Sequence, residues 1–213
     1  LNGRNQEVAG LAIASGATGG NNSINSSSAS LSTLNVNTAA ASASTFGGVI
    51  KGNLALIKTG SDSLTLSNTN TYTGSTTVSG GTLYINGNIS TSALTTVQNG
   101  ATLGGSGGTV GDLTIEAGGY LSPGNSPGTL TVDGDYTQYG TLIAEVSGLN
   151  PGTQHDQVLV NGAVSLGGSL SLAFSSFTPA NGDLIFILLN DLSDSISGTF
   201  TGLSQGAIVG NYG

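Results

Sequence analysis

The fold can be inferred from residues 63–85, which read SLTLSNTNTYTGSTTVSGGTLYI. Apolar and polar side chains alternate at both ends of this segment, in Leu64-Thr65-Leu66 and again in Leu83-Tyr84-Ile85. A period of two is typical of a β-strand with one buried face, and the Gly-Gly pair before the second segment favours a tight turn. The two leading leucines are 19 positions apart. We therefore expect two short strands in equivalent places of a repeat.

The same alternation recurs along the rest of the chain. It is found at Leu113-Thr114-Ile115, Leu130-Thr131-Val132, Val158-Leu159-Val160 and Leu170-Ser171-Leu172. Asn-Gly and Gly-Gly pairs, which supply the backbone angles of tight turns, separate the segments. No long window places apolar residues at helical spacing opposite charged ones. The sequence predicts an all-β protein.

A nearly constant step indicates how these strands are arranged. Leu64, Leu83, Leu103 and Leu121 follow one another at intervals of 19, 20 and 18 residues. Copies or near copies of Gly-Thr-Leu begin at residues 81, 101, 128, 140 and 168. A step of this size is typical of one coil of a β-solenoid, in which coils stack because no single coil buries its apolar face. We expect about 18–20 residues per coil, roughly ten coils and a rod about 50 Å long.

Charged residues are few and unevenly distributed. The chain has three Lys or Arg and 11 Asp or Glu, for a net charge of −8. Arg4, Lys51 and Lys58 all lie early, so only His155 could be a cation in the rest of the chain. Such a surface cannot gather phosphates, which excludes nucleic-acid binding and argues against a helix that lies on anionic lipid.

Cysteine is absent, so a disulfide framework, a zinc ribbon and a thiol nucleophile are excluded. The longest strongly apolar run covers residues 184–189. A run of six residues is far shorter than a membrane-spanning helix requires. We therefore expect no membrane span in this chain.

Several phrases together resemble a known family. Asn-Thr-Tyr-Thr-Gly at 70–74, with residues 44–50 before it and 76–83 after it, resembles the β-strand repeat of autotransporter passenger domains, the passenger-associated transport repeat. Pro-Gly-Asn-Ser-Pro-Gly-Thr at 123–129 and the segment 156–170 resemble the sequel in the same proteins. The resemblance covers nearly the whole chain. It implies a right-handed parallel β-helix that is exported, held at or released from a bacterial surface, and folded progressively as it emerges.

Residues 21–33 depart from the pattern because they are rich in Asn and Ser. A segment of this composition is either a linker or a polar coil of the solenoid. We favour the coil, in which Ile24, Leu31 and Leu34 face inward.

The composition changes again from about Pro179, where apolar runs lengthen and Asp residues and aromatics appear. We expect β-helix coils over residues 1–178 and a C-terminal strand-rich segment or cap over residues 179–213. The final phrase, 207–213, is interpreted as cut short relative to a longer parent chain.

His155 and Asp156 are the first candidates for chemistry because His155 is the only imidazole. A catalytic triad needs a base that a carboxylate orients, together with an oxyanion hole. Adjacent residues of an extended strand point to opposite faces, so their adjacency does not make a dyad. We interpret His155 as a loop histidine that follows the turn at 151–154.

The acidic residues are the candidates for a metal site or for hydrolysis. Calcium prefers six to eight oxygen ligands, and neither an EF-hand loop nor a calcium-binding nonapeptide repeat is present. A lyase of this shape would need a Lys or Arg base, which the chain lacks after residue 58, and a hydrolase would need carboxylates gathered in one cleft. We therefore expect no enzyme, no catalytic residue, no metal and no cofactor. The acidic residues to which this applies are Asp133, Asp135, Asp183, Asp191 and Asp194.

The tyrosines offer a weaker possibility. Aromatic side chains either form a platform for sugars or stack between coils and cover an edge, and we favour the second role here. The residues concerned are Tyr72, Tyr84, Tyr120, Tyr136 and Tyr139.

These observations favour a non-catalytic structural segment, a β-helical passenger or stalk that spaces, displays or adheres at a bacterial surface. The alternative is a subunit of an extracellular fibre that stacks head to tail, because solenoid ends expose strand edges. A weaker alternative is a carbohydrate-binding module. The expected partners are neighbouring coils or identical subunits, and a host surface or extracellular polysaccharide. The expected location is extracellular, secreted or attached to the outer membrane through a missing part of the parent protein.

Overall fold

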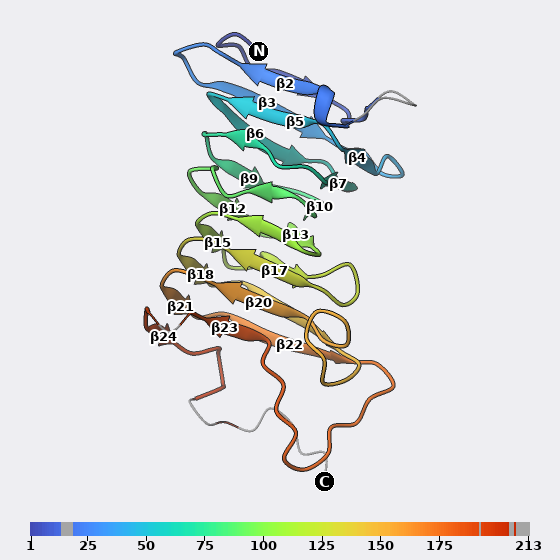
Figure 1. The fold of residues 1–213 in the computed structure, drawn as a ribbon, viewed down its shortest axis with the longest axis vertical. Coiled ribbons are helices and arrows are strands. Elements are labelled where there is room, and N and C mark those ends of the chain that lie inside the picture. The colour runs from blue at the N-terminus through green and yellow to red at the C-terminus, as the bar shows by residue number, and fades with distance from the viewer. Residues whose placement is uncertain (14–18, 192, 205–206, 208–213) are drawn as a thin grey trace.

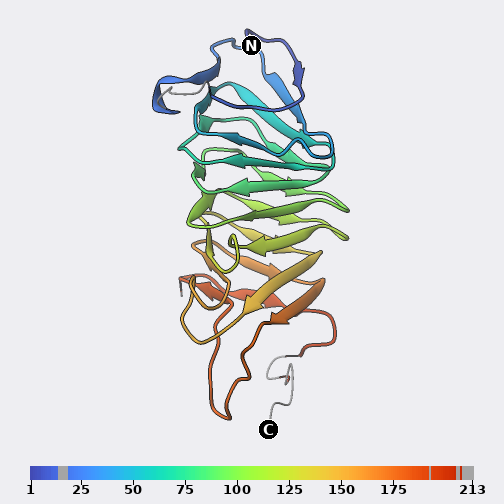
Figure 2. The same ribbon diagram turned by 90° about the vertical axis from the view of Figure 1, so that its right-hand side faces the viewer.

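The strands of this protein form a parallel β-helix. The computed structural model describes residues 1–13, 19–191, 193–204 and 207. Within these residues every pairing between strands is parallel, and the coils stack along the long axis from the N-terminal strands at one end to β22–β24 at the other (Figures 1 and 2). The all-β solenoid expected from the sequence is confirmed. The part of the chain described contains one short 3-10 helix, η1 (Gly19–Asn21), and no helix long and apolar enough to cross a membrane.

The longest sheet, sheet 1, forms one face of the helix. In the described residues it holds nine strands. In spatial order they are β1 (Gln6–Val8), β3 (Ser32–Asn37), β6 (Leu54–Thr59), β9 (Thr76–Val78), β12 (Thr95–Val97), β15 (Leu113–Ile115), β18 (Tyr136–Gln138), β21 (Val164–Leu166) and β24 (Ile196–Gly198).

Sheet 2 forms the second face, again with its strands in chain order. They are β4 (Ser44–Phe46), β7 (Ser63–Leu66), β10 (Thr82–Ile85), β13 (Thr102–Gly105), β16 (Tyr120–Pro123), β19 (Thr141–Val146) and β22 (Ser169–Phe174).

The third face consists of two shorter sheets that a parallel bridge between Thr69 and Asn88 links. The first contains β2 (Ser23–Ser26), β5 (Val49–Gly52) and β8 (Thr71–Tyr72). The second contains β11 (Asn88–Ile89), β14 (Gly108–Val110), β17 (Thr129–Val132), β20 (Gln157–Val160) and β23 (Leu188–Asn190).

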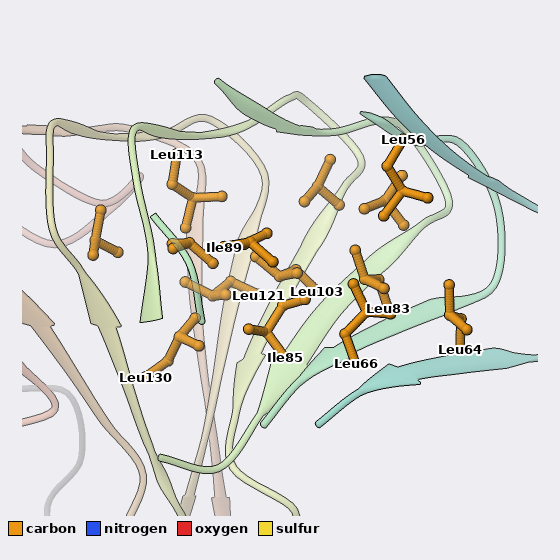
Figure 3. Close-up of a cluster of buried hydrophobic side chains, with 14 of the residues drawn as sticks. Leu56, Leu64, Leu66, Leu83, Ile85, Ile89, Leu103, Leu113, Leu121 and Leu130 are labelled. Atoms are coloured by element: carbon orange, nitrogen blue, oxygen red, sulfur yellow. The ribbon is translucent and has the colours of Figure 1, made fainter. Parts of the chain in front are cut away.

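The leucine spacing sets the register of sheet 2. Leu64 pairs with Leu83, Leu83 with Leu103, and Leu103 with Leu121, so the four leucines form one inward column. All four are fully buried, and Figure 3 shows them meeting side chains from the other faces, including Leu56, Leu113 and Leu130. This column confirms the coil assignment made from the intervals of 19, 20 and 18 residues.

One copy of the Gly-Thr-Leu unit lies on another face. The copies that begin at residues 81, 101, 140 and 168 lead into strands of sheet 2, whereas the copy at 128–130 leads into β17 on the third face. The reason is the turn after β16, which carries the chain past a corner before the unit begins. Local sequence therefore identifies a strand start but not its face.

Coil length varies more than expected. Successive pairings along sheet 1 from Leu34 onward are separated by 22, 20, 19, 18, 23, 28 and 32 residues. Only the central coils fit the expected 18–20, because longer turns enlarge the coils towards both ends. Nine strands in the described part of sheet 1, at about 4.8 Å each, correspond to about 40 Å of stacked coils rather than 50 Å.

The interior is not entirely apolar. Lys58 occupies an inward position of β6, between Val36 and Val78 in the same column, and is fully buried. Its Nζ donates hydrogen bonds to the carbonyl oxygens of Thr59, Gly60 and Gly80 at 2.7, 3.2 and 2.9 Å. Burial lowers the pKa of Lys58 to about 8, although the carboxylate of Asp62 acts in the opposite direction. All three ammonium hydrogens thus have a backbone acceptor.

The Asn-Thr-Tyr-Thr-Gly phrase supplies a second set of interior polar contacts. Asn70 is buried, accepts a 2.8 Å hydrogen bond from the backbone of Ile50 in the preceding coil and donates one to the carbonyl oxygen of Asn68. The hydroxyl of the buried Tyr72 lies 2.6 Å from the hydroxyl of Thr76. These contacts satisfy polar groups at a corner where the backbone ladder is interrupted.

The polar segment 21–33 is part of the helix, as we favoured, because it contains β2 and the start of β3. Leu34 is buried and Ile24 packs against the core. The expectation for Leu31 is wrong, since this side chain is 51% exposed in the turn before β3. Beyond Pro179, β23 and β24 continue two of the sheets, and residues 208–213 of the final phrase lie outside the described residues.

Candidate functional site

A polar groove of about 430 Å³ lies on the outer face of sheet 2. Strand residues form its floor, and a turn and two carboxylates form its walls. The lining residues are Thr65, Tyr84, Thr102, Ser122, Pro123, Gly124, Asn125, Ser126, Glu145 and Asp156. A volume of this size is within the range of small-ligand sites.

The floor of the groove depends on a glycine. In the outward column of sheet 2, Thr65 pairs with Tyr84, Tyr84 with Gly104, and Gly104 with Ser122. A Cβ atom at Gly104 would lie 3.0 Å from both Cδ1 and Cε1 of Tyr84, so the aromatic ring lies across this glycine. Tyr84 therefore packs with one edge of its ring against Gly104 of the neighbouring coil, and the residue also lines the groove.

Asp156 connects the two walls. Its Oδ1 accepts a 2.8 Å hydrogen bond from the backbone N–H of Gly128, at the end of the turn that follows β16. Its Oδ2 accepts a 2.9 Å hydrogen bond from the backbone N–H of Glu145 in β19. The turn after β16 and the loop between β19 and β20 project from the same side of the helix (Figure 1).

The environment of Asp156 disfavours its ionised form. Burial is the main cause and raises the pKa of Asp156 to about 6, against the lowering effect of the hydrogen bonds from Glu145 and Gly128. The nearby charge of Glu145 raises it further. Gly124 has a φ of +100°, and a Cβ there would lie 2.6 Å from Asp156 Oδ1. The turn can approach the carboxylate this closely only because position 124 is glycine.

His155 does not join this site. It belongs to the loop that connects β19 and β20, its side chain is buried there, and Nδ1 lies 3.2 Å from the carbonyl oxygen of Gly148. Among the described residues, His155 Nε2 has no hydrogen-bond partner. The histidine does lie in the loop, as expected, but it is buried there, and the Asp156 carboxylate is occupied by backbone N–H groups rather than by the imidazole.

The other acidic candidates bind backbone or side-chain donors. Asp133 accepts from the Asn161 amide at 2.8 Å, and Asp135 accepts from the backbone of Ala163 at 2.9 Å, both one coil further on. Asp191 binds the backbone and hydroxyl of Ser193, which lowers the pKa of Asp191. No group of three acidic or histidine side chains that could hold a metal ion occurs in the part of the chain that the structure describes.

The five tyrosines do not form one platform. Tyr72 and Tyr136 are fully buried, so the possibility that they bind sugars is wrong for these two. Tyr120 and Tyr139 are exposed, and only Tyr84 lines the groove.

The sequence did not predict that Glu145 and Asp156 are neighbours. They are 11 positions apart, and the loop between β19 and β20 brings them together. The available signal was the long interval between the Gly-Thr-Leu units at 140 and 168, which predicts a loop that projects from the regular coil.

The geometry defines a parallel β-helix with a lateral groove. Residues 56–85 match the Passenger-associated-transport-repeat family. In three dimensions this match extends from β6 to β10, about one and a half coils, and includes the Asn-Thr-Tyr-Thr-Gly corner.

A relative is similar over a longer stretch. The Adhesin BmaC autotransporter of Brucella suis biovar 1 (strain 1330) is 37% identical over 82 residues. The matched region covers 38% of this chain and 2% of the relative. The resemblance to autotransporter passenger repeats is therefore confirmed, while this chain corresponds to a small part of that adhesin.

Proposed function

We propose that this chain is a non-catalytic structural segment of an exported bacterial surface protein. It would be a β-helical passenger or stalk with a role in display or adhesion. The observation that carries the proposal is the unbroken inward column of leucines through the coils, of which the passenger-associated repeat is one unit. Such a stack gains stiffness from hydrogen bonds between coils and from a continuous apolar interior. The similarity to an adhesin supports a location at the cell surface or outside the cell.

The hydrogen bonds of the Asp156 carboxylate support a non-catalytic role for this residue. A general acid or base needs a carboxyl oxygen that is free to exchange a proton with substrate. Both oxygens of Asp156 accept backbone hydrogen bonds instead. We assign Asp156 to holding the loops together and retain the division into coils over 1–178 and a C-terminal segment over 179–213 as part of the proposal.

A display experiment tests this function. Residues 1–213 would be inserted between an epitope tag and the membrane anchor of an exported bacterial protein, and tag exposure would be measured on intact cells by antibody labelling. The tag should be exposed and the segment should resist added protease. Leu83→Asp, which disrupts the core, serves as the matched control. A tag that stays inaccessible in the unmodified fusion, or a segment that protease degrades as fast as the control, would contradict the proposal.

A second candidate is self-assembly by head-to-tail stacking. It is favoured by β22, the outermost described strand of sheet 2, whose inward residues Leu170 and Leu172 are half-buried whereas their counterparts Leu142 and Ala144 are buried. Edge strands with a partly covered apolar face promote pairing with another chain. Light scattering across a concentration series, with negative-stain images, tests this candidate. Filaments of uniform width would support it, and a monomeric rod at every concentration would contradict it.

A further inference from the structure

We propose that the groove on sheet 2 binds a neutral saccharide unit of a glycan, with the Tyr84 ring as its stacking surface and the Glu145 carboxylate as an acceptor of sugar hydroxyls. The inference rests on the proposed function because it gives the surface partner of an adhesive segment a chemical class. It assigns the site to residues from five coils and two loops rather than to the tyrosines as a set.

The stacking surface is preorganised. Gly104 provides the space against which one edge of the Tyr84 ring packs, and Thr65 and Ser122 flank this pair in the same column. A ring that packing already holds loses little conformational freedom when a ligand binds. Aromatic side chains combine an apolar face with a polar tip, which suits the apolar face and peripheral hydroxyls of a pyranose.

The polar lining matches a ligand with many hydroxyl groups. The hydroxyls of Thr65, Thr102 and Ser122 can donate and accept, and the side chain of Asn125 offers both an acceptor and two donors. When the Glu145 carboxylate is ionised, it can accept hydrogen bonds but cannot donate them. A sugar hydroxyl also donates and accepts, so each hydroxyl of the ligand can form hydrogen bonds with these side chains in more than one orientation.

The charge of the groove selects among glycans. Its lining contains Glu145 and Asp156 and no basic residue. The basic residues of the chain, Arg4, Lys51 and Lys58, belong to other parts of the helix, and the Lys58 ammonium is occupied by carbonyl oxygens. An acidic sugar would therefore meet uncompensated like charge, which disfavours sialylated, sulfated and uronic-acid units.

A divalent cation is a less suitable ligand for the same walls. Calcium needs six to eight oxygens, and both oxygens of Asp156 already accept backbone N–H groups. Among the described residues, the groove lacks the third carboxylate or histidine that a metal group would supply. The aromatic floor, which a cation site does not need, favours the sugar.

The test is an array of neutral, sialylated, sulfated and uronic-acid oligosaccharides, followed by calorimetric titration of the neutral oligosaccharide that binds best. Tyr84→Ala should weaken binding at least about tenfold, because truncation of an aromatic residue at the centre of a binding site typically has an effect of this size. Glu145→Gln should weaken it several-fold, and Gly104→Ala should weaken it by displacing the ring without removing it. Tyr139→Ala removes an exposed tyrosine outside the groove and should leave the affinity unchanged.

Several outcomes would overturn the proposal. They are an array on which no neutral oligosaccharide binds, binding confined to acidic glycans, equal affinity of the Tyr84→Ala and unmodified chains, and binding that a chelator abolishes. The melting temperatures of the Glu145→Gln and Tyr139→Ala variants should match that of the unmodified chain. Glycan binding together with failed surface display would contradict the proposed function alone, whereas normal display of a chain that binds no glycan would contradict this inference alone.

Discussion

The ammonium nitrogen of Lys58 lies 2.9 Å from the carbonyl oxygen of Gly80, which belongs to the next coil of the helix. Two further carbonyl oxygens, those of Thr59 and Gly60, complete its set of acceptors. The only fully buried lysine among the described residues thus connects two coils from inside the stack. An interior charge held in this way makes stability depend on pH.

Stability should rise between about pH 8 and pH 10. The pKa of Lys58 is about 8 in the folded protein and 10.5 for the exposed group, so in this window the unfolded chain binds more protons. Below pH 8 the buried charge lowers the free energy of unfolding by its full amount. As the pH increases, the lysine loses its proton and the free energy of unfolding rises by up to about 3 kcal/mol. Urea unfolding at several pH values measures the effect.

The control for that experiment is Lys58→Met, which fills the interior without a titratable group. Its stability should be flat over the same window. Above pH 10 both proteins should lose stability, because burial raises the pKa of Tyr72 and Tyr136 while the unfolded tyrosines ionise. Parallel curves for the two proteins between pH 8 and pH 10 would show that Lys58 does not titrate as expected.

Leu83→Asp should destabilise the helix by more than about 4 kcal/mol, because it removes a buried leucine and places a carboxylate in an apolar interior. Thermal melting and sensitivity to protease both report the loss. Thr96→Asp is the matched control, since Thr96 lies at an outward position of β12 with Thr77 and Thr114 beside it. Similar melting curves for the two variants would contradict the assigned inward face.

Stability should fall between about pH 4 and pH 6. The pKa of Asp156 is raised from 3.8 to about 6, so in this window the folded protein binds more protons than the unfolded chain. The favourable contribution of the protonated form is present below pH 4 and is lost as the pH rises through 6. Asp156→Asn should remove this part of the pH dependence. An unchanged slope in the variant would show that another group causes it.

Substitution of two glycines with positive φ distinguishes the cost of backbone strain from the cost of steric overlap. Gly105 has a φ of +128°, and a Cβ there would lie 2.0 Å from the carbonyl oxygen of Ile85. Gly100 has a φ of +79° with no atom within 4 Å of its Cβ position. Gly100→Ala should cost about 1 kcal/mol, the strain alone, whereas Gly105→Ala should cost about 4 kcal/mol or more. Equal losses in chemical unfolding would contradict the close approach of the coils.

The strands and their repeat could be predicted from the sequence because they depend on local patterns. Alternation in Leu64-Thr65-Leu66 and Leu83-Tyr84-Ile85 determines which side chains face inward, and the interval between their leucines equals one coil. Both features survive in three dimensions because parallel stacking preserves the interval whenever the turns between the strands keep a constant length.

The groove, the buried lysine and the face occupied by β17 depended on the tertiary structure. Glu145 and Asp156 meet because the loop after β19 folds back along β19, and Asp156 then also reaches the turn after β16. No local period encodes such a return. Lys58 is inward because its column is shared with Val36 and Val78, and a lysine in an alternating strand is otherwise expected to face water. Local alternation determines which side chains of a strand face inward, whereas the lengths of all the turns together determine which strands become neighbours.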